Sequence, residues 1–203
     1  MTQLSFPCRG RGGFRPGSGR KRGRRVTHHG RELLRRRIPL HVIWRTRTNV
    51  RSLRGKRLWR QIRESFRRCC EKAGFRLVHF SVQGTHIHMI VEADDLAALS
   101  RGMQGLGVSI AKRINLASQR HGAVFDDRFF SRQLRTPREV ANAVEYVLHN
   151  QTRHLQRQGL EVPAAPDPFT SEMFRDADPP LVVAAETWLL RVGYLRTRVL
   201  QAG

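Results

Sequence analysis

The chain has 203 residues, and its 38 Lys and Arg against 16 Asp and Glu give a formal net charge of +22. A chain of this length can bury a core of ordinary size, and its 39% hydrophobic residues exclude a wholly disordered basic tail. Arginine supplies 34 of the 38 basic residues, which favours bidentate recognition of phosphate and predicts a polyanionic partner. Nucleic acid is favoured over a membrane surface, because no basic amphipathic helix carries an aromatic apolar face.

The cysteines and the apolar segments indicate the compartment. Cys8, Cys69 and Cys70 form neither a C-x-x-C pair nor a disulfide pattern, so we expect reduced thiols. No apolar run reaches the length of a signal peptide at the N-terminus or of a membrane-spanning helix elsewhere. We therefore expect a soluble, cytoplasmic protein with no membrane partner.

The charge divides the chain into three parts. Residues 1–37 carry 12 basic residues and one acidic residue, residues 38–153 carry a net charge of +12, and residues 154–203 carry −1. Gly and Pro prevent regular structure in the first part, which we interpret as a flexible basic arm; a solubilising tail without a partner is the alternative. The middle part is the expected folded domain, and the Pro-rich last part is the expected linker and appendage. In the arm we expect DNA contacts from Arg20, Lys21, Arg22, Arg24 and Arg25.

The first half of the middle part predicts a strand, a helix and a hairpin. Residues 38–46 are apolar and β-branched, as in a strand. Apolar residues recur at helical spacing over 53–73, and Gly74 is the expected C-terminal stop of that helix. Two further strands follow at 75–82 and 86–91, with Gln83-Gly84-Thr85 as the turn between them.

The second half predicts a long helix, a strand and a last helix. Apolar residues step by three or four from Leu96 to Ala117, which is the strongest helical pattern in the chain. Residues 124–134 are expected to form a strand. Thr136-Pro137-Arg138-Glu139 is a capping box with Pro at the first helical position, and it opens a helix to about Arg153.

The order of these elements, β-α-β-β-α-β-α, predicts an α+β fold. Its first six elements match the ferredoxin-like arrangement, an antiparallel four-stranded sheet with two helices on one face. The other face is left for chemistry, with the last helix docked beside it.

Two histidines stand on the predicted open face. Period-two alternation over 86–91 puts His86 and His88 on one face and Ile87, Met89 and Val91 on the other. The Cα atoms of two such histidines lie roughly 6 to 7 Å apart, a spacing that suits two ligands of one metal ion. Taken alone, the pair is more typical of two half-exposed strand histidines that stack on nucleic acid or on each other.

Tyr146 and Asn150 are four residues apart on the predicted last helix and therefore share a face. Both fall beside the apolar stripe of Val140, Val144 and Val147. A tyrosine there is either a residue at the edge of the core or a nucleophile within reach of the histidines.

These motifs together resemble a known family. Gln-Gly-Thr-His-Ile-His-Met-Ile-Val follows a strand, Gly-Met-Gln-Gly-Leu lies on the next helix, and Arg-Thr-Pro-Arg-Glu-Val precedes Glu-Tyr-Val-Leu-His-Asn. Over about residues 38–153 the chain resembles the HUH-type single-tyrosine transposases, and among them is most similar to the REP-associated tyrosine transposases of bacteria. In the turn, Gly84-Thr85 stands where Asn is common in relatives.

The resemblance implies a reaction and the residues that carry it. His86 and His88 match the HUH pair and Asn150 the third ligand of a divalent ion, Mg or Mn, while Tyr146 matches the nucleophile on the catalytic helix. The implied reaction cleaves hairpin-forming single-stranded DNA, leaves a 5′-phosphotyrosine and a free 3′-hydroxyl, and then transfers the strand. Relatives are monomers or homodimers. No general base is assigned.

Several roles stay open. We expect phosphate contacts from the first helix at Arg57, Arg60, Arg67 and Arg68. Phe129 and Phe130 either stack bases or belong to the core, and His41 and His79 are expected in the core or against DNA. Two alternative functions remain: a ferredoxin-like module that binds single-stranded nucleic acid without chemistry, and a metal-dependent phosphodiesterase that uses water.

Overall fold

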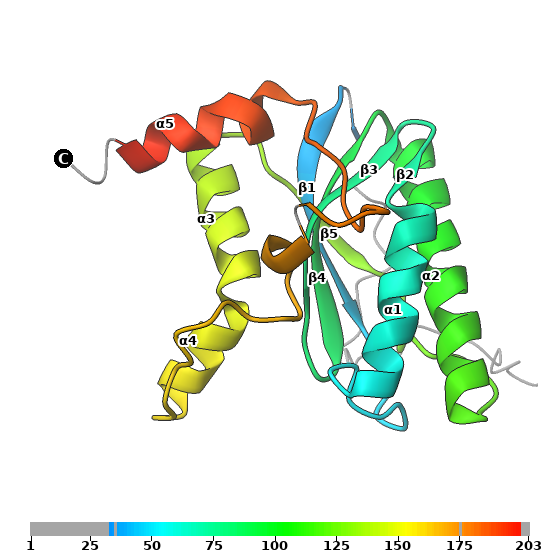
Figure 1. The fold of residues 1–203 in the computed structure, drawn as a ribbon. Coiled ribbons are helices and arrows are strands. Elements are labelled where there is room, and N and C mark those ends of the chain that lie inside the picture. Colours follow the sequence, from blue (N-terminus) through cyan, green and yellow to red (C-terminus); the bar gives the residue numbers. More distant parts are fainter. Residues whose placement is uncertain (1–32, 35, 175, 200–203) are drawn as a thin grey trace, which may run out of the picture.

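The fold is taken from a computed structural model that describes residues 33–34, 36–174 and 176–199. Its central sheet consists of five antiparallel strands in the order β2-β3-β4-β1-β5 (Figure 1). The strands are β1 (Ile38–Arg45), β2 (Glu71–Lys72), β3 (Phe75–Val82), β4 (His86–Ala93) and β5 (Phe130–Gln133). Without β2, this is the strand order of a ferredoxin-like sheet, so the α+β prediction is confirmed.

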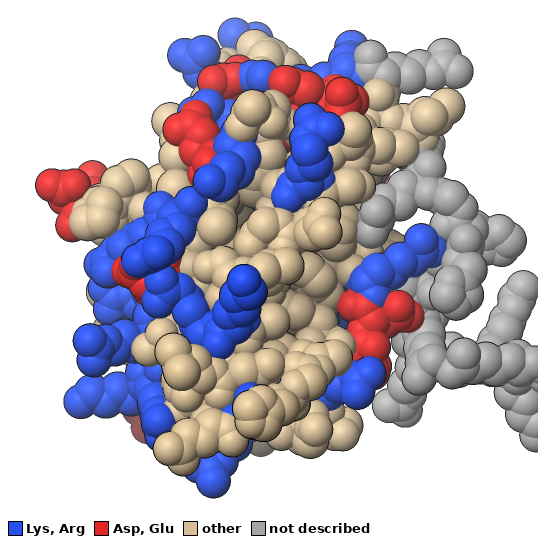
Figure 2. All heavy atoms as spheres, turned by 90° about the vertical axis from the view of Figure 1, so that its right-hand side faces the viewer, with Lys and Arg blue, Asp and Glu red and all other residues tan. Residues whose placement is uncertain are grey.

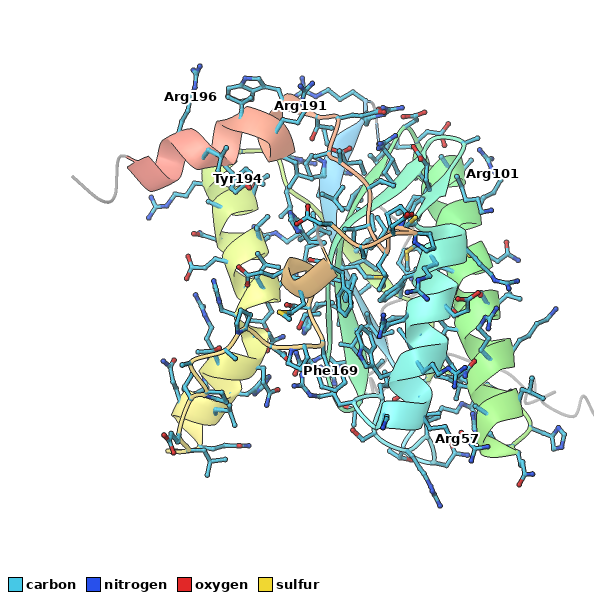
Figure 3. All side chains as sticks on the ribbon, viewed as in Figure 1. Arg57, Arg101, Phe169, Arg191, Tyr194 and Arg196 are labelled. Atoms are coloured by element: carbon cyan, nitrogen blue, oxygen red, sulfur yellow. The ribbon has the colours of Figure 1, made fainter. Side chains whose placement is uncertain are left out.

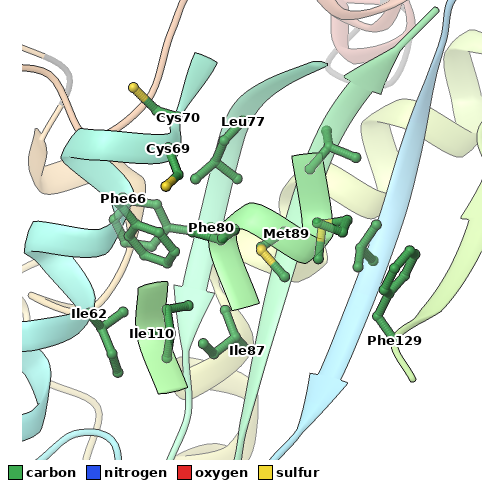
Figure 4. Close-up of a cluster of buried hydrophobic side chains, with 14 of the residues drawn as sticks. Ile62, Phe66, Cys69, Cys70, Leu77, Phe80, Ile87, Met89, Ile110 and Phe129 are labelled. Atoms are coloured by element: carbon green, nitrogen blue, oxygen red, sulfur yellow. The ribbon is translucent and has the colours of Figure 1, made fainter. Parts of the chain in front are cut away.

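Helices α1 (Lys56–Cys69) and α2 (Leu96–Ser118) cover one face of the sheet (Figure 1). Asp95 begins α2, because its side chain accepts a hydrogen bond from the amide of Ala98 at 2.6 Å. Ile87 and Met89 of β4 belong to the same buried cluster as residues of both helices, such as Phe66 and Ile110 (Figure 4). The alternation predicted for β4 therefore holds on this face.

Several boundaries differ from the sequence prediction. Helix α1 ends at Cys69, and Gly74, with φ of +72°, lies in the turn between β2 and β3 rather than at the end of the helix. The predicted strand over 124–134 is shorter in the structure, because only 130–133 pair with β1 and Phe125 makes an isolated bridge to Thr46.

Cys69 and Cys70 are buried free thiols.

Helix α3 (Pro137–Leu148) begins as the sequence predicts. The Thr136 side chain accepts a hydrogen bond from the Glu139 amide, and the Glu139 carboxylate accepts one from the Thr136 amide, both at 3.2 Å. The helix does not run on to Arg153, however. His149 leaves the helical region with φ of −106° and ψ of 19°, and a second helix, α4 (Asn150–Arg157), follows.

Helix α3 covers part of the second face of the sheet. Its residues Val140, Val144 and Val147 lie in a buried cluster with Val78 of β3 and Ile90 of β4. The face expected to be open is therefore partly covered by α3. Helix α5 (Tyr194–Val199) and the π-helical turn η2 (Leu189–Gly193) pack in turn against α3 (Figure 1).

The tail before α5 lies along the domain. Asp167 accepts two hydrogen bonds from Arg54, at 2.7 and 2.9 Å, and the ring of Phe169 lies 5.2 Å from that of Trp59. Further on, the fully buried carboxylate of Glu92 accepts hydrogen bonds from the amides of Glu186 and Thr187, which fixes the start of the last helical segment. No helix among the described residues is long and apolar enough to cross a membrane.

We predict that replacing two glycines of α2, Gly102 and Gly105, by alanine changes the free energy of unfolding in opposite directions. A Cβ atom at Gly102 would lie 2.1 Å from the Cγ atom of Phe75, so Gly102→Ala should lower the free energy of unfolding by about 1 to 3 kcal/mol. At Gly105 nothing lies within 4 Å of the added atom, so Gly105→Ala should raise it by up to about 1 kcal/mol. Urea denaturation measures both, and equal effects would contradict this account of the contact between α2 and β3.

Candidate active site

The histidine pair lies at the beginning of β4. His86 is half-buried, whereas His88 is only 3% exposed, and their ring centroids are 4.7 Å apart at an interplanar angle of 82°. In the antiparallel register, His86 lies opposite Arg45 and His88 opposite Ile43 of β1. The two imidazoles thus project from the face of the sheet that α1 and α2 do not cover.

Tyr146 comes to the pair from the last turn of α3. Its ring centroid lies 5.2 Å from that of His88, in an edge-to-face arrangement of 85°. The side chain is half-buried against the valine cluster that fixes α3 on the sheet. Burial of the valines thereby sets the position of the phenol beside the imidazoles.

Asn150 is the first residue of α4 and is 1% exposed. Among the described residues, its Nδ2 atom and the Nε2 atom of His88 are buried without any hydrogen-bond partner. Leaving such a buried polar atom unpaired costs about 1 to 3 kcal/mol. No group of three or more His, Cys, Asp or Glu side chains among the described residues could hold a metal ion.

A third histidine joins this group. The Nε2 atom of His41, on β1, lies 3.2 Å from the Nδ1 atom of His88, and the two rings stack at 5.4 Å and 22°. His41 also meets Tyr146 edge to face at 6.0 Å. By contrast, His79 lies elsewhere, with its Nδ1 atom 3.3 Å from the hydroxyl of Ser171. Sequence reasoning treated these two histidines alike, because the register of β1 against β4 was unknown.

Burial holds the three imidazoles neutral at pH 7. Desolvation is the main cause that lowers the pKa of His41 to about 4, of His86 to about 4 and of His88 to about 3. The charge of Arg132 adds to the effect on His41, and those of Arg45 and His154 add to the effect on His86. Neutral imidazoles keep a lone pair on one ring nitrogen, which is the state that binds a cation.

His154 is a site neighbour that sequence reasoning missed. It acts electrostatically on both His86 and His88, and it therefore lies on the side of α4 that is near them. The signal was present in the sequence, because Tyr146, Asn150 and His154 recur at intervals of four residues.

The structure does not bring the predicted DNA-binding residues of α1 to this site. Helix α1 lies on the opposite face of the sheet from the histidines. Figure 2 shows the molecule from the right-hand side of Figure 1, and Lys and Arg side chains gather along the left of this view. Arg57 and Arg60 are exposed, and Arg57 lies at the N-terminal end of α1 (Figure 3). Arg67 and Arg68 approach Glu64, at 3.7 and 2.8 Å, and so part of their charge is compensated.

The remaining predicted contacts divide in two. Arg20, Lys21, Arg22, Arg24 and Arg25 lie outside the described residues. Of the two phenylalanines, Phe129 is buried and meets Trp44 edge to face, whereas Phe130 is 47% exposed on the edge strand β5.

We predict that acid destabilises the protein through these histidines. Their pKa values are lower in the fold than in the unfolded chain, so unfolding takes up protons below about pH 6.5 and stability falls as the pH drops towards 4. His41 and His88 should each remove about 1 kcal/mol per pH unit from the free energy of unfolding over this range. Urea titrations from pH 7.5 to 4.5, in the presence of a chelator, measure the slope. His41→Phe should reduce it, and stability independent of pH would contradict the burial of these rings.

The fold is similar to two solved structures. One is a REP-associated tyrosine transposase bound to a REP hairpin, which matches 79% of this chain and 93% of its own, with a TM-score of 0.57 and 16% identity. The other, from Deinococcus radiodurans, is assigned as a transposase and matches 66% of this chain and 100% of its own, with a TM-score of 0.41 and 15% identity. No curated protein matches this chain in sequence.

The two solved structures are too distant in sequence to assign a family, but a family model does so. The model of IS200-like transposases matches residues 35–151, which include both histidines of β4, Tyr146 and Asn150. This match spans more than half of the chain, and the chain therefore belongs to the IS200-like transposases, the tyrosine transposase family that its motifs predicted.

Proposed function

We propose that this transposase cleaves single-stranded DNA with Tyr146, keeps the 5′ end as a phosphotyrosine and transfers it to another 3′-hydroxyl. The observation that carries the proposal is the position of the Tyr146 ring, 5.2 Å from that of His88, whose buried Nε2 atom has no partner among the described residues. A phenol beside a site for a cationic or phosphate ligand is the arrangement that nucleophilic attack on phosphorus requires.

The residues at the site fit a divalent cation. His86 and His88 offer imidazole nitrogens, and Asn150 offers its amide. The oxygen and nitrogen of an amide are assigned from their surroundings, and turning the Asn150 amide by 180° places its oxygen where the unpartnered Nδ2 atom stands. We propose these three as ligands of Mg or Mn, with water or phosphate oxygens completing the shell. Such an ion, when bound, supplies a Lewis acid for the scissile phosphate.

The proposed strand transfer needs no external energy source. The phenolate oxygen of Tyr146 forms a bond to phosphorus while the bond from phosphorus to the 3′ oxygen breaks, and the leaving oxygen takes up a proton. The ordinary pKa of tyrosine is near 10, so cationic surroundings are needed to favour the phenolate. A second 3′-hydroxyl then attacks the phosphotyrosine and releases the phenol. Because the covalent link keeps the phosphodiester energy, the strand is rejoined without ATP.

The proposed substrate is DNA that forms a hairpin with an adjoining single strand. The similar tyrosine transposase is bound to a REP hairpin, which supports this class of DNA for the present chain. The site and α1 lie on opposite sides of the sheet, so we propose that the single strand enters the site while other phosphates contact α1 and the arm.

The charge on α1 supports its role as a second contact surface. The helix carries six basic residues and one acidic residue, Glu64. The pKa of Arg63 is lowered, mainly by burial and secondly by the charge of Arg67. The buried Nε atoms of both arginines have no hydrogen-bond partner among the described residues. Like charges held this close together are stabilised by a polyanion.

Two alternative functions compete with this proposal. A binding module without chemistry would use the sheet as a stacking platform, but β4 presents His86 and His88 there, with Tyr146 above His88. A phosphodiesterase that uses water would need the same histidines but not the phenol.

Tyr146→Phe separates these alternatives. With labelled single-stranded hairpin DNA and Mn²⁺, we expect the wild-type protein to form a covalent adduct that migrates as a protein–DNA band in a denaturing gel. The adduct should be lost in Tyr146→Phe, because no phenolate remains to attack phosphorus. The matched control is Tyr194→Phe in α5, the only other tyrosine of the chain, which should form the adduct as the wild type does.

Cleavage that persists in Tyr146→Phe would favour the phosphodiesterase. Binding without any cleavage by the wild type would favour the binding module. Either result overturns the proposed transfer.

The α1 surface is tested by the salt dependence of DNA binding. Replacing both Arg57 and Arg60 by alanine should weaken binding and reduce the magnitude of the slope of log K against log [salt] by about 1.4 to 1.8, the loss of two phosphate contacts. Fluorescence anisotropy with hairpin DNA measures this slope. The control replaces Arg191 and Arg196, which are also exposed but lie at the opposite end of the molecule (Figure 3). An equal loss in the control would refute a specific role for α1.

A further inference from the structure

His41 is not a proposed ligand, yet it contacts two of the side chains proposed for the reaction. Its Nε2 atom lies 3.2 Å from Nδ1 of His88, its ring stacks on that of His88, and it meets the ring of Tyr146 at 6.0 Å. The position is set by the sheet, because His41 lies opposite Ile90 in the register of β1 with β4, diagonally across from His88.

The contact between the two imidazoles links their tautomers. A neutral imidazole carries one N–H and one lone pair, so a hydrogen bond between the two nitrogens needs one donor and one acceptor. If the Nδ1–H of His88 donates to Nε2 of His41, the Nε2 atom of His88 keeps its lone pair. If His41 donates instead, Nε2 of His88 carries the proton and cannot bind a cation. The position of one proton in this pair therefore decides whether His88 is a ligand.

The surroundings of His88 make His41 the principal control on this choice. His88 is 3% exposed, and its Nε2 atom has no partner among the described residues. The Nε2 atom of His41 is the hydrogen-bonding partner of its other nitrogen, Nδ1. Ligand histidines in proteins are generally oriented by such a bond from the second ring nitrogen, usually to a carboxylate or carbonyl oxygen. Here the acceptor is a third imidazole.

We propose that His41 is the positioning residue of the site: its Nε2 atom accepts the Nδ1–H of His88, and so fixes the ring and the tautomer in which Nε2 of His88 is free to bind the divalent ion. This inference rests on the proposed function, because it assigns a role toward the proposed metal ligand.

The test uses two variants of His41 and one matched control. His41→Phe keeps a flat ring between β1 and Tyr146 but removes the acceptor. His41→Gln places an amide oxygen at about the position of Nε2 and so retains an acceptor. The control is His79→Phe on β3, since His79 lies opposite the same residue, Ile90, from the other edge of β4, and its Nδ1 atom lies 3.3 Å from the hydroxyl of Ser171.

The first measurement is the tautomer of His88 in the full-length, metal-free protein. Long-range ¹H–¹⁵N correlation spectra at one neutral pH, with the His88 signals assigned by substitution, distinguish a proton on Nδ1 from one on Nε2. We expect the Nδ1–H tautomer in the wild type, in His41→Gln and in His79→Phe, and a mixture of tautomers in His41→Phe. The Nε2–H tautomer in the wild type would overturn the inference, as would an unchanged spectrum in His41→Phe.

The second measurement is the affinity for Mn²⁺ by titration calorimetry. His41→Phe should bind Mn²⁺ about 10- to 100-fold more weakly than the wild type, and His41→Gln should recover most of that loss. His79→Phe should bind as the wild type does. The Mn²⁺ concentration required for half-maximal Tyr146 adduct should shift by the same factor, whereas the maximal yield recovers at saturating Mn²⁺. Equal affinities in the wild type and His41→Phe would overturn the role of His41.

These outcomes are distinct from a failure of the proposed function. A wild-type protein that binds no Mn²⁺ and forms no adduct refutes the metal site and the reaction, and the tautomer spectra then still decide whether His41 holds His88. If His41→Phe does not fold, His41→Leu, which also lacks an acceptor, takes its place. An unchanged tautomer of His88 in that variant would overturn the inference.

Discussion

Hydrogen bonding of β4 along both of its edges is the constraint on which the site depends. Strand β4 pairs with β3 on one side and with β1 on the other, so its backbone direction is fixed and its side chains alternate strictly between the two faces. One set, with Ile87 and Met89, enters the core beneath α1 and α2. The other set places His86 and His88 under α3. The same alternation therefore contributes both to the stability of the domain and to the geometry of the candidate site.

Most of the fold could be predicted from local patterns. The alternation in 86–91, the apolar stripe of α2 and the capping box at Thr136 are all encoded within a few neighbouring residues, and each has its expected counterpart in the structure. The errors came from pairings that local patterns do not contain. Gly74 was assigned to a helix end because nothing in the sequence announced the two-residue strand β2, and the break at His149 interrupts a helical pattern without Gly or Pro.

The residues of the candidate site could be predicted from the sequence to a similar extent. Four residues of the family motifs could be named from the sequence, and three of them, His86, His88 and Tyr146, have rings that contact one another in series. His41 could not be separated from His79, because only the register of β1 against β4 brings it to His88. The arginines of α1 were expected to contact phosphates, and amphipathic periodicity gives the exposed side of their helix but not which of them are paired with Glu64.

The site draws on segments that are far apart in the chain: β1, β4 and the junction of α3 with α4. No short contiguous fragment contains it, since His41 on β1 precedes the histidines of β4 by more than forty residues and the phenol comes more than fifty residues after them. During synthesis, a chain that has completed β4 has the imidazoles but neither Tyr146 nor the valines that would hold it. The candidate site is thus complete only after α3 has been synthesised and packed on the sheet.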